Sequence, residues 1–223
     1  MNGFNVAIDG PAGAGKSTVA KKAAERLGFL YIDTGAMYRA LTYAALTERI
    51  DLNDEHALTA LLEGSALELE PSSTGTTVYW NEKNITADIR TDLVNKNVSL
   101  VSSHKEVRLA MVARQQALAK AKKAVLDGRD IGTHVLPDAN VKIFLTASVE
   151  ERARRRHQEQ LDKGLPSDFE KLKEDIAKRD ELDSTRLFAP LMQAEDAQVV
   201  DTTEMGIEEV INTILHLVKE QSV

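Results

Sequence analysis

Cysteine is absent from the sequence, which excludes disulfide bonds, thiolate catalysis and zinc held by cysteine. Long apolar runs are absent as well, so no segment reaches the length of a membrane span. Residues 1–5 lack the basic and apolar regions of a signal peptide, and we expect none. The formal net charge is −7, which disfavours non-specific binding to nucleic acid or to an anionic membrane. We therefore expect a cytoplasmic protein whose partners are small molecules, with neither nucleic acid nor a membrane among them.

The 223 residues are 43% hydrophobic and 28% charged, a balance typical of a globular chain that buries one core. Short apolar strand patterns alternate with helical patterns, which predicts an α/β fold with a parallel sheet. The predicted strands are residues 4–9, 29–32, 124–127, 141–146 and 198–200. A last helix is predicted over residues 207–218, where apolar side chains recur at helical spacing and would face the core.

Residues 67–86 interrupt this alternation. Residues 71–75 (Pro-Ser-Ser-Thr-Gly) are typical of a turn, residues 76–80 favour a strand, and residues 81–84 indicate a hairpin turn before Ile85. We therefore predict a small antiparallel sheet inserted into the main fold.

The stretch from residue 10 to residue 17 fits the phosphate-binding pattern G-x-x-x-x-G-K-[ST]. A predicted strand leads into it and a helical pattern over residues 18–27 leaves it, which is the context of a P-loop rather than of an ordinary glycine-rich turn. Small residues let the backbone N–H groups wrap a triphosphate, and the start of the helix adds positive potential. We expect Lys16 to reach the β- and γ-phosphates and the Ser17 hydroxyl to bind Mg²⁺. The predicted nucleotide-binding residues are Gly10, Pro11, Ala12, Gly13, Ala14, Gly15, Lys16, Ser17 and Thr18.

The second predicted strand is followed by Asp-Thr-Gly-Ala-Met-Tyr-Arg, residues 33–39. Thr34 is placed as the N-cap of a helix and Arg39 lies about one turn into it, so that hydroxyl and guanidinium together could bind a phosphate. Asp-Thr-Gly also occurs in aspartic proteases, but those enzymes need a second such carboxylate, and the sequence has no second Asp-Thr/Ser-Gly.

The third predicted strand ends in Asp-Gly-Arg-Asp, residues 127–130. A carboxylate at this point, next to the strand of the P-loop, commonly holds Mg²⁺ through its water shell, so Asp127 is the candidate on the metal side. Arg129 and Asp130 would project beyond the strand ends, where ligands bind in such sheets. A glycine-containing turn with charged side chains is the alternative.

Two further segments concentrate arginine. Residues 151–164 carry four arginines in five positions (152 and 154–156), which indicates either a solvated helix face or a mobile lid that closes on phosphates. Downstream, Arg179, Asp183 and Arg186 follow at intervals of four and three, which predicts one helix face. A surface ladder of salt bridges is the alternative there.

Taken together, these segments resemble the bacterial cytidylate kinases, a family of nucleoside monophosphate kinases. The resemblance covers the whole chain, and the combination of the P-loop with Asp-Thr-Gly-Ala-Met-Tyr-Arg and Asp-Gly-Arg-Asp-Ile-Gly is far more specific than the P-loop alone. Some members have Ser at the position of Thr34, which keeps the hydroxyl. The resemblance implies one P-loop kinase domain over residues 1–223, with a core (1–35, 101–150, 165–223), a lobe for the nucleoside monophosphate (about 36–100) and a lid (about 151–164).

The resemblance also implies roles for individual residues. Lys16, Arg129 and Arg155 would act in catalysis. Thr34, Arg39, Arg129 and Arg186 would hold the acceptor phosphate, with Arg179 nearby, and Asp183 would bond the ribose. Ser99, Arg108 and Asp130 would read cytosine, whose amino group donates to oxygens and whose N3 and O2 accept from a guanidinium. Ser102 and Ser103 lie close to Ser99 in the sequence and carry the same hydroxyl.

The implied activity is reversible, Mg²⁺-dependent transfer of the γ-phosphoryl group of ATP to CMP or dCMP, by a protein that we expect to be monomeric. A P-loop switch such as a GTPase is one alternative, but the string at residues 95–98 lacks the aspartate of Asn-Lys-x-Asp, and no Asp-x-x-Gly occurs. A kinase for UMP, AMP or shikimate is the nearer alternative, and only the cytosine-reading set separates it from a cytidylate kinase.

Overall fold

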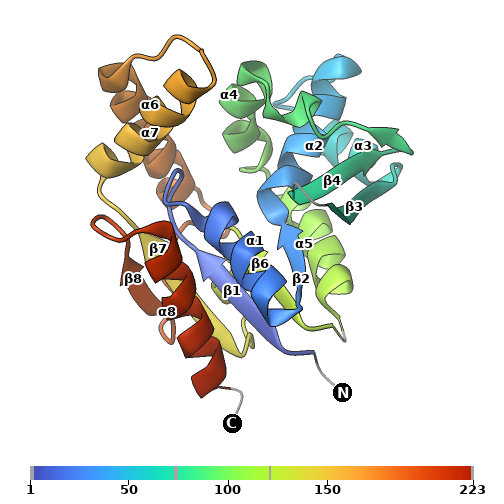
Figure 1. Ribbon diagram of the computed structural model, residues 1–223. Coiled ribbons are helices and arrows are strands. Elements are labelled where there is room, and N and C mark those ends of the chain that lie inside the picture. Colours follow the sequence, from blue (N-terminus) through green and yellow to red (C-terminus); the bar gives the residue numbers. More distant parts are fainter. Residues whose placement is uncertain (1–2, 73–74, 121, 222–223) are drawn as a thin grey trace.

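A parallel sheet of five strands forms the centre of the protein (Figure 1). The computed structural model describes residues 3–72, 75–120 and 122–221. In the sheet the order is β2 (Leu30–Asp33), β6 (Ala124–Asp127), β1 (Asn5–Asp9), β7 (Val141–Thr146) and β8 (Gln198–Asp201). The predicted α/β fold is confirmed, and the predicted strand ends differ from those observed by at most one residue.

Helices cover both faces of this sheet because its strands are apolar on both sides. On β1, Val6 and Ile8 pack into one core cluster with α1 (Lys16–Leu27) and α8 (Ile207–Glu220). Ala7, between them, packs into a second cluster with α2 (Thr34–Thr47) and α5 (Lys105–Ala119). Strand side chains alternate between faces, so one central strand anchors two cores.

The predicted antiparallel insert is confirmed as a sheet of β3 (Leu67–Ser72), β4 (Gly75–Trp80) and β5 (Lys83–Asn84). It lies on the same side of the molecule as α3 (Glu55–Glu63), the 3₁₀ turn η1 (Asp88–Arg90) and α4 (Asp92–Val101) (Figure 1). The turn predicted at residues 71–75 is wrong in part, because residues 71 and 72 pair in β3 opposite β4, while residues 73 and 74 lie outside the described part. The tight turn before β5 occupies Asn81 and Glu82, both at positive φ.

The opposite side of the molecule carries α6 (Val149–Asp162) and α7 (Phe169–Thr185), which pack against each other (Figure 1). Arg186 is not part of the α7 face predicted for it, because the helix ends at Thr185 and the backbone of Arg186 is extended. Between β6 and β7 the chain forms a π-helical turn, η2 (Ile131–Val135). None of the helices in the described ranges is long and apolar enough to cross a membrane.

Candidate functional site

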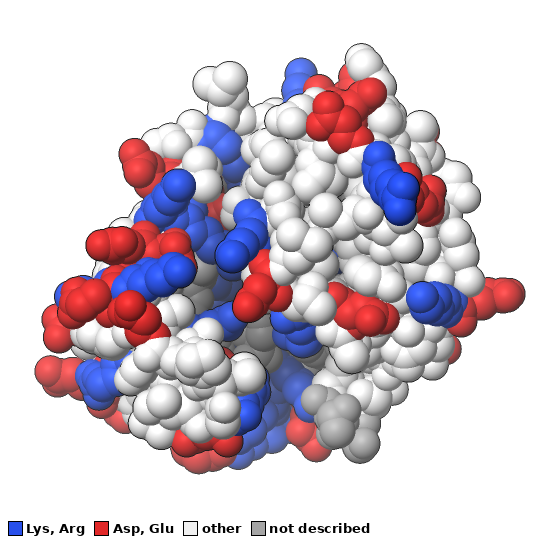
Figure 2. All heavy atoms as spheres, turned by 90° about the horizontal axis from the view of Figure 1, so that it is seen from above, with Lys and Arg blue, Asp and Glu red and all other residues white. Residues whose placement is uncertain are grey.

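A cleft of about 710 Å³ lies between the carboxyl ends of the central strands, α6–α7 and α4. Nine arginines and Lys16 line it, against six carboxylates. Seen from above, Lys and Arg side chains gather along this hollow (Figure 2). A chain of net charge −7 thus concentrates positive charge in one place, which suits a ligand with several negative charges.

The P-loop passes from β1 into α1 as predicted, and its glycines 10, 13 and 15 all adopt positive φ. Lys16 is the first residue of α1, and its buried ammonium group donates to the Pro11 carbonyl at 2.7 Å. Burial, and then the charge of Arg129, hold the pKa of Lys16 well below its usual range. An anion in the loop would stabilise the charged ammonium group and so raise this pKa again, which suits a phosphate-binding lysine.

The metal candidates Ser17 and Asp127 meet at the end of β6. The Ser17 hydroxyl donates to Oδ2 of Asp127 at 2.7 Å, and the Tyr31 hydroxyl donates to Oδ1 at 2.8 Å. Burial raises the pKa of Asp127 to about 6. A hydroxyl and one carboxylate suit a Mg²⁺ that takes its other oxygens from phosphates and water. Among the described residues, no group of three or more His, Cys, Asp or Glu side chains is arranged to hold a metal ion.

Asp33, not Thr34, is the N-cap of α2. The Asp33 carboxylate accepts a hydrogen bond from the Ala36 N–H at 2.8 Å. Thr34 is the first helical residue, and its buried hydroxyl donates to the Asp127 carbonyl at 2.6 Å. The predicted cap was wrong because both residue types can cap a helix and only the backbone decides which of them precedes the first turn.

The six candidates for the acceptor phosphate and the ribose all line the cleft. Arg129 donates to Asp183 at 2.8 Å, which ties the end of β6 to α7. Burial, and then the nearby Arg129 and Arg39, lower the pKa of Arg179 to about 10. Within the described part of the chain, Nε of Arg179 and Nη2 of Arg186 are buried without a hydrogen-bond partner. Crowded guanidinium groups with unused donors suit an anion that could accept from them.

The base-reading candidates are only partly brought together. Arg108 is buried and pairs directly with Asp130, whose other oxygen lies 3.6 Å from Arg186. Ser99 is half-buried on α4 and does not line the cleft, whereas Ser102 does, and its carbonyl accepts from Arg108 at 3.0 Å.

The arginines of α6 differ from one another in ways that their spacing did not reveal. Arg152 is buried and donates to the carbonyls of Ala147 and Ala12 at 2.9 and 2.8 Å. It also pairs with Asp180 at 2.7 Å, which joins α6, α7 and the P-loop. Arg155 pairs with Glu151 at 2.8 Å and lines the cleft. Arg154 points into solvent, with 69% of its side chain exposed.

Two tyrosines of the site were missed in the sequence. Tyr31 holds Asp127, and the Tyr38 ring lies 5.4 Å from the Arg108 guanidinium in the cleft wall. Tyr38 stands next to Arg39 in a motif already identified, so its position was a usable signal. Tyr31 carried no such signal, because it belongs to an apolar strand and meets Asp127 only through strand pairing.

Comparison with known proteins places these features in one family. The family model described as cytidylate kinase matches residues 6–220. A cytidylate kinase of Shouchella clausii is 77% identical over 220 residues, which cover 99% of this chain and 98% of the relative. One of Geobacillus kaustophilus is 59% identical, with 98% and 97% covered. In fold, an uncharacterised protein of Eubacterium ventriosum matches with a TM-score of 0.53 at 12% identity, covering 97% of this chain and 98% of its own. The chain therefore belongs to the cytidylate kinase family.

Proposed function

We propose that this protein is a cytidylate kinase that transfers the γ-phosphoryl group of ATP to CMP or dCMP, giving ADP and CDP or dCDP. The observation that carries the proposal is the arrangement of one cleft, with a P-loop at one end and the buried Arg108–Asp130 pair at the other. Family membership supports the same activity. The two ends would bind the two nucleotides, and the arginines between them would bind the phosphates that react.

At the donor end, the P-loop backbone and Lys16 would hold the triphosphate of ATP. Ser17 and Asp127 would hold Mg²⁺, which neutralises charge on the donor phosphates. Hydrogen bonds to the Pro11 carbonyl and to Asp127 already orient Lys16 and Ser17. Lys16 would exchange its hydrogen bond for the phosphates, and Ser17 would exchange its own for Mg²⁺. This preorganisation lowers the cost of ordering the loop when the nucleotide binds.

At the acceptor end, Arg39, Arg129, Arg179 and Arg186 would surround the phosphate of CMP, with the Thr34 hydroxyl beside them. A phosphate oxygen is already a nucleophile, so the protein needs no dedicated base. Catalysis then consists of holding the two phosphates in line and neutralising their charge, to which Lys16, Arg129 and Arg155 would contribute. Asp183 accepts from Arg129 through Oδ2 and would use its other oxygen to accept from the hydroxyls of the ribose.

Cytosine would be distinguished from uracil by Arg108 and Asp130. A carboxylate accepts from the amino group of cytosine, and a guanidinium donates to N3 and O2. Uracil reverses the polarity at N3 and at position 4, which would leave buried groups of the protein unpaired. Ser102 lines the cleft beside Arg108, while Ser99 would have to approach the base by a movement of α4.

The division into core, monophosphate lobe and lid is also part of the proposal. Residues 36–100, which include most of α2, α3, the antiparallel sheet and most of α4, would be the lobe, and residues 151–164, which include most of α6, the lid. Closure of both over the substrates would exclude water and so suppress hydrolysis of ATP. We also propose a cytoplasmic enzyme, with which the absence of cysteine is compatible. We propose a monomer because no long apolar stripe that would be exposed stands out in the sequence.

A coupled assay of ADP release tests the activity. With ATP and Mg²⁺, CMP and dCMP should give fast turnover, UMP and AMP should give slow turnover, and omission of the acceptor should give almost none. Comparable rates with UMP would contradict the role of Arg108 and Asp130 but leave a nucleotide kinase. No turnover with any monophosphate would overturn the proposed function.

A further inference from the structure

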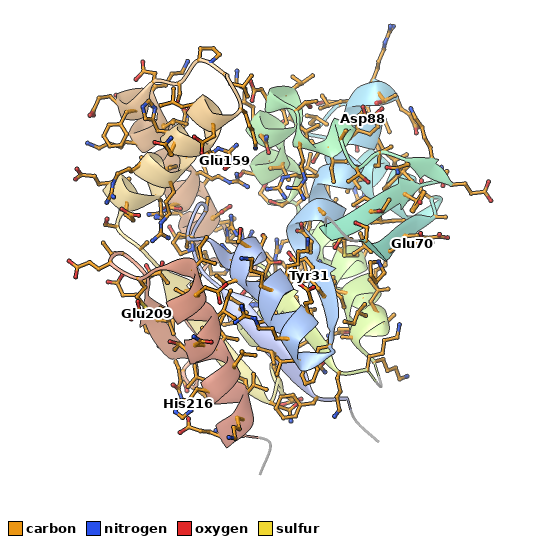
Figure 3. The ribbon with its side chains drawn as sticks, viewed as in Figure 1. Tyr31, Glu70, Asp88, Glu159, Glu209 and His216 are labelled. Carbon is orange, nitrogen blue, oxygen red and sulfur yellow. The ribbon has the colours of Figure 1, made fainter. Side chains whose placement is uncertain are left out.

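Tyr31 occupies a place on β2 from which its hydroxyl reaches the end of the neighbouring strand. β2 pairs with β6 so that Asp33 stands opposite Asp127, and Tyr31 lies two residues earlier on β2. Its ring packs against the core cluster that contains α1, beside the sheet (Figure 3). The long side chain then spans the distance along the strand, and the hydroxyl lies 2.8 Å from Oδ1 of Asp127.

The hydroxyls of Tyr31 and Ser17 donate to different oxygens of the Asp127 carboxylate. Tyr31 donates to Oδ1 and Ser17 donates to Oδ2, so rotation about the last bond of the Asp127 side chain would break both hydrogen bonds. Ser17 is also a candidate ligand of Mg²⁺ and would rearrange when the nucleotide binds. Tyr31 has no such second role, so its hydrogen bond to Asp127 can persist when the nucleotide binds.

Tyrosine is protonated at neutral pH, so the Tyr31 hydroxyl is a donor to the Asp127 carboxylate. Packing alone does not account for a tyrosine here, because phenylalanine would fill the same space against α1 without placing a polar atom on Asp127.

We infer that Tyr31 is a positioning residue for the magnesium–nucleotide complex, acting through the Asp127 carboxylate that its hydroxyl orients. The inference rests on the proposed function, since it assigns Asp127 to the metal side. Tyr31 contributes to the part of nucleotide binding that depends on Mg²⁺. It does not contribute to the part that the P-loop backbone and Lys16 supply alone.

Calorimetric titration with a non-hydrolysable ATP analogue, once with Mg²⁺ and once with EDTA, separates these two parts. The Kd in EDTA divided by the Kd in Mg²⁺ measures the metal-dependent part of binding. We expect Tyr31→Phe to reduce that ratio about three- to tenfold, the effect of one hydrogen bond, and to change the Kd in EDTA less than about twofold. Tyr79→Phe, on β4 of the antiparallel sheet, is the matched control and should leave both Kd values unchanged.

A double substitution tests whether Tyr31 acts through Asp127. In the Asp127→Asn background, Tyr31→Phe should change the Kd ratio less than about twofold, because the oriented carboxylate is already gone.

An unchanged ratio in the single Tyr31→Phe variant would overturn the inference, as would an equal loss of affinity in Mg²⁺ and in EDTA. If the unsubstituted protein binds the analogue no better with Mg²⁺ than without it, the proposed function fails as well. If Mg²⁺ tightens binding to the unsubstituted protein and Tyr31→Phe leaves that tightening unchanged, only the inference about Tyr31 fails and the proposed function stands.

Discussion

At the scale of single residues, the buried Arg108–Asp130 pair is the most consequential contact of the acceptor end. Both side chains are almost fully buried, so each has lost its hydration and depends on the other. Breaking such a pair from one side leaves an uncompensated charge, which costs more than the intact pair contributes. The same carboxylate is within reach of Arg186, so it also helps to place a phosphate-binding candidate.

We predict that Asp130→Ala weakens the fold and the selection of the base together. The free energy of unfolding should fall by about 3–5 kcal/mol, because Arg108 stays buried and unpaired. The preference for CMP over UMP, measured as the ratio of kcat/KM values, should fall at least about tenfold, as expected when a polar contact to the base is lost.

A matched control is available in Asp196→Ala. Asp196 also pairs with a cation, Lys142 at 2.9 Å, but its side chain is 66% exposed and lies outside the cleft. Urea unfolding and the CMP to UMP ratio should both remain close to those of the unsubstituted protein. An Asp130→Ala variant that kept the full preference for CMP would refute base reading by this carboxylate.

At the scale of elements, the P-loop depends on its first glycine for a reason that lies in the next strand. Gly10 has φ 146°, and a Cβ there would lie 1.9 Å from the Leu145 carbonyl oxygen of β7. The loop therefore turns directly over the backbone of a neighbouring strand. Gly28, which ends α1, has φ 67°, and among the described residues a Cβ there would meet no heavy atom within 4 Å beyond its chain neighbours.

We predict that alanine has very different effects at these two glycines. Gly28→Ala should cost about 1–2 kcal/mol, the price of a left-handed conformation for a residue with a Cβ. Gly10→Ala should cost clearly more and weaken ATP binding, because β1 and β7 must separate to admit the methyl group. Urea unfolding and nucleotide titration of both variants measure this, and equal losses at the two positions would contradict it.

At the scale of the whole molecule, Asp9 connects the central strand to the segment that follows β6. Its two oxygens accept hydrogen bonds from the N–H groups of Ile131 and Gly132 at 2.8 and 2.7 Å. Burial is the largest influence and raises the pKa of Asp9 to about 6, against the opposite effect of these bonds. The native protein therefore keeps this proton at pH values where the unfolded chain has lost it.

This difference predicts how stability changes with pH. Between about pH 4 and pH 6 the native state binds more protons at Asp9 than the unfolded state does, so the contribution of Asp9 to the free energy of unfolding falls as pH rises. The Asp9→Asn side chain cannot titrate, so this variant does not show the fall in the free energy of unfolding that Asp9 causes as pH rises. From pH 4 to pH 7 its stability relative to the unsubstituted protein should improve by up to about 3 kcal/mol, at 1.36 kcal/mol for each pKa unit. Parallel stability curves for the two proteins would show that Asp9 does not titrate in this range.

The sequence by itself determined the elements of this protein and the chemistry that they carry. Strand and helix patterns are local, and so is the P-loop, whose conformation depends on small residues next to one another. The positions of the main strands, the antiparallel insert and the phosphate-binding turn could therefore be predicted. Family resemblance supplied candidate roles for residues whose function no local pattern reveals.

Only the tertiary structure decided which of those residues meet. Tyr31 and Asp127 are 96 positions apart and touch because β2 pairs with β6 in one register. Arg152 is buried and donates to the Ala12 carbonyl of the P-loop, although it belongs to the same arginine run as the exposed Arg154. Such contacts depend on strand order and on the rotation of each helix about its axis. Both are set by the packing of the whole core, which no short stretch of sequence contains.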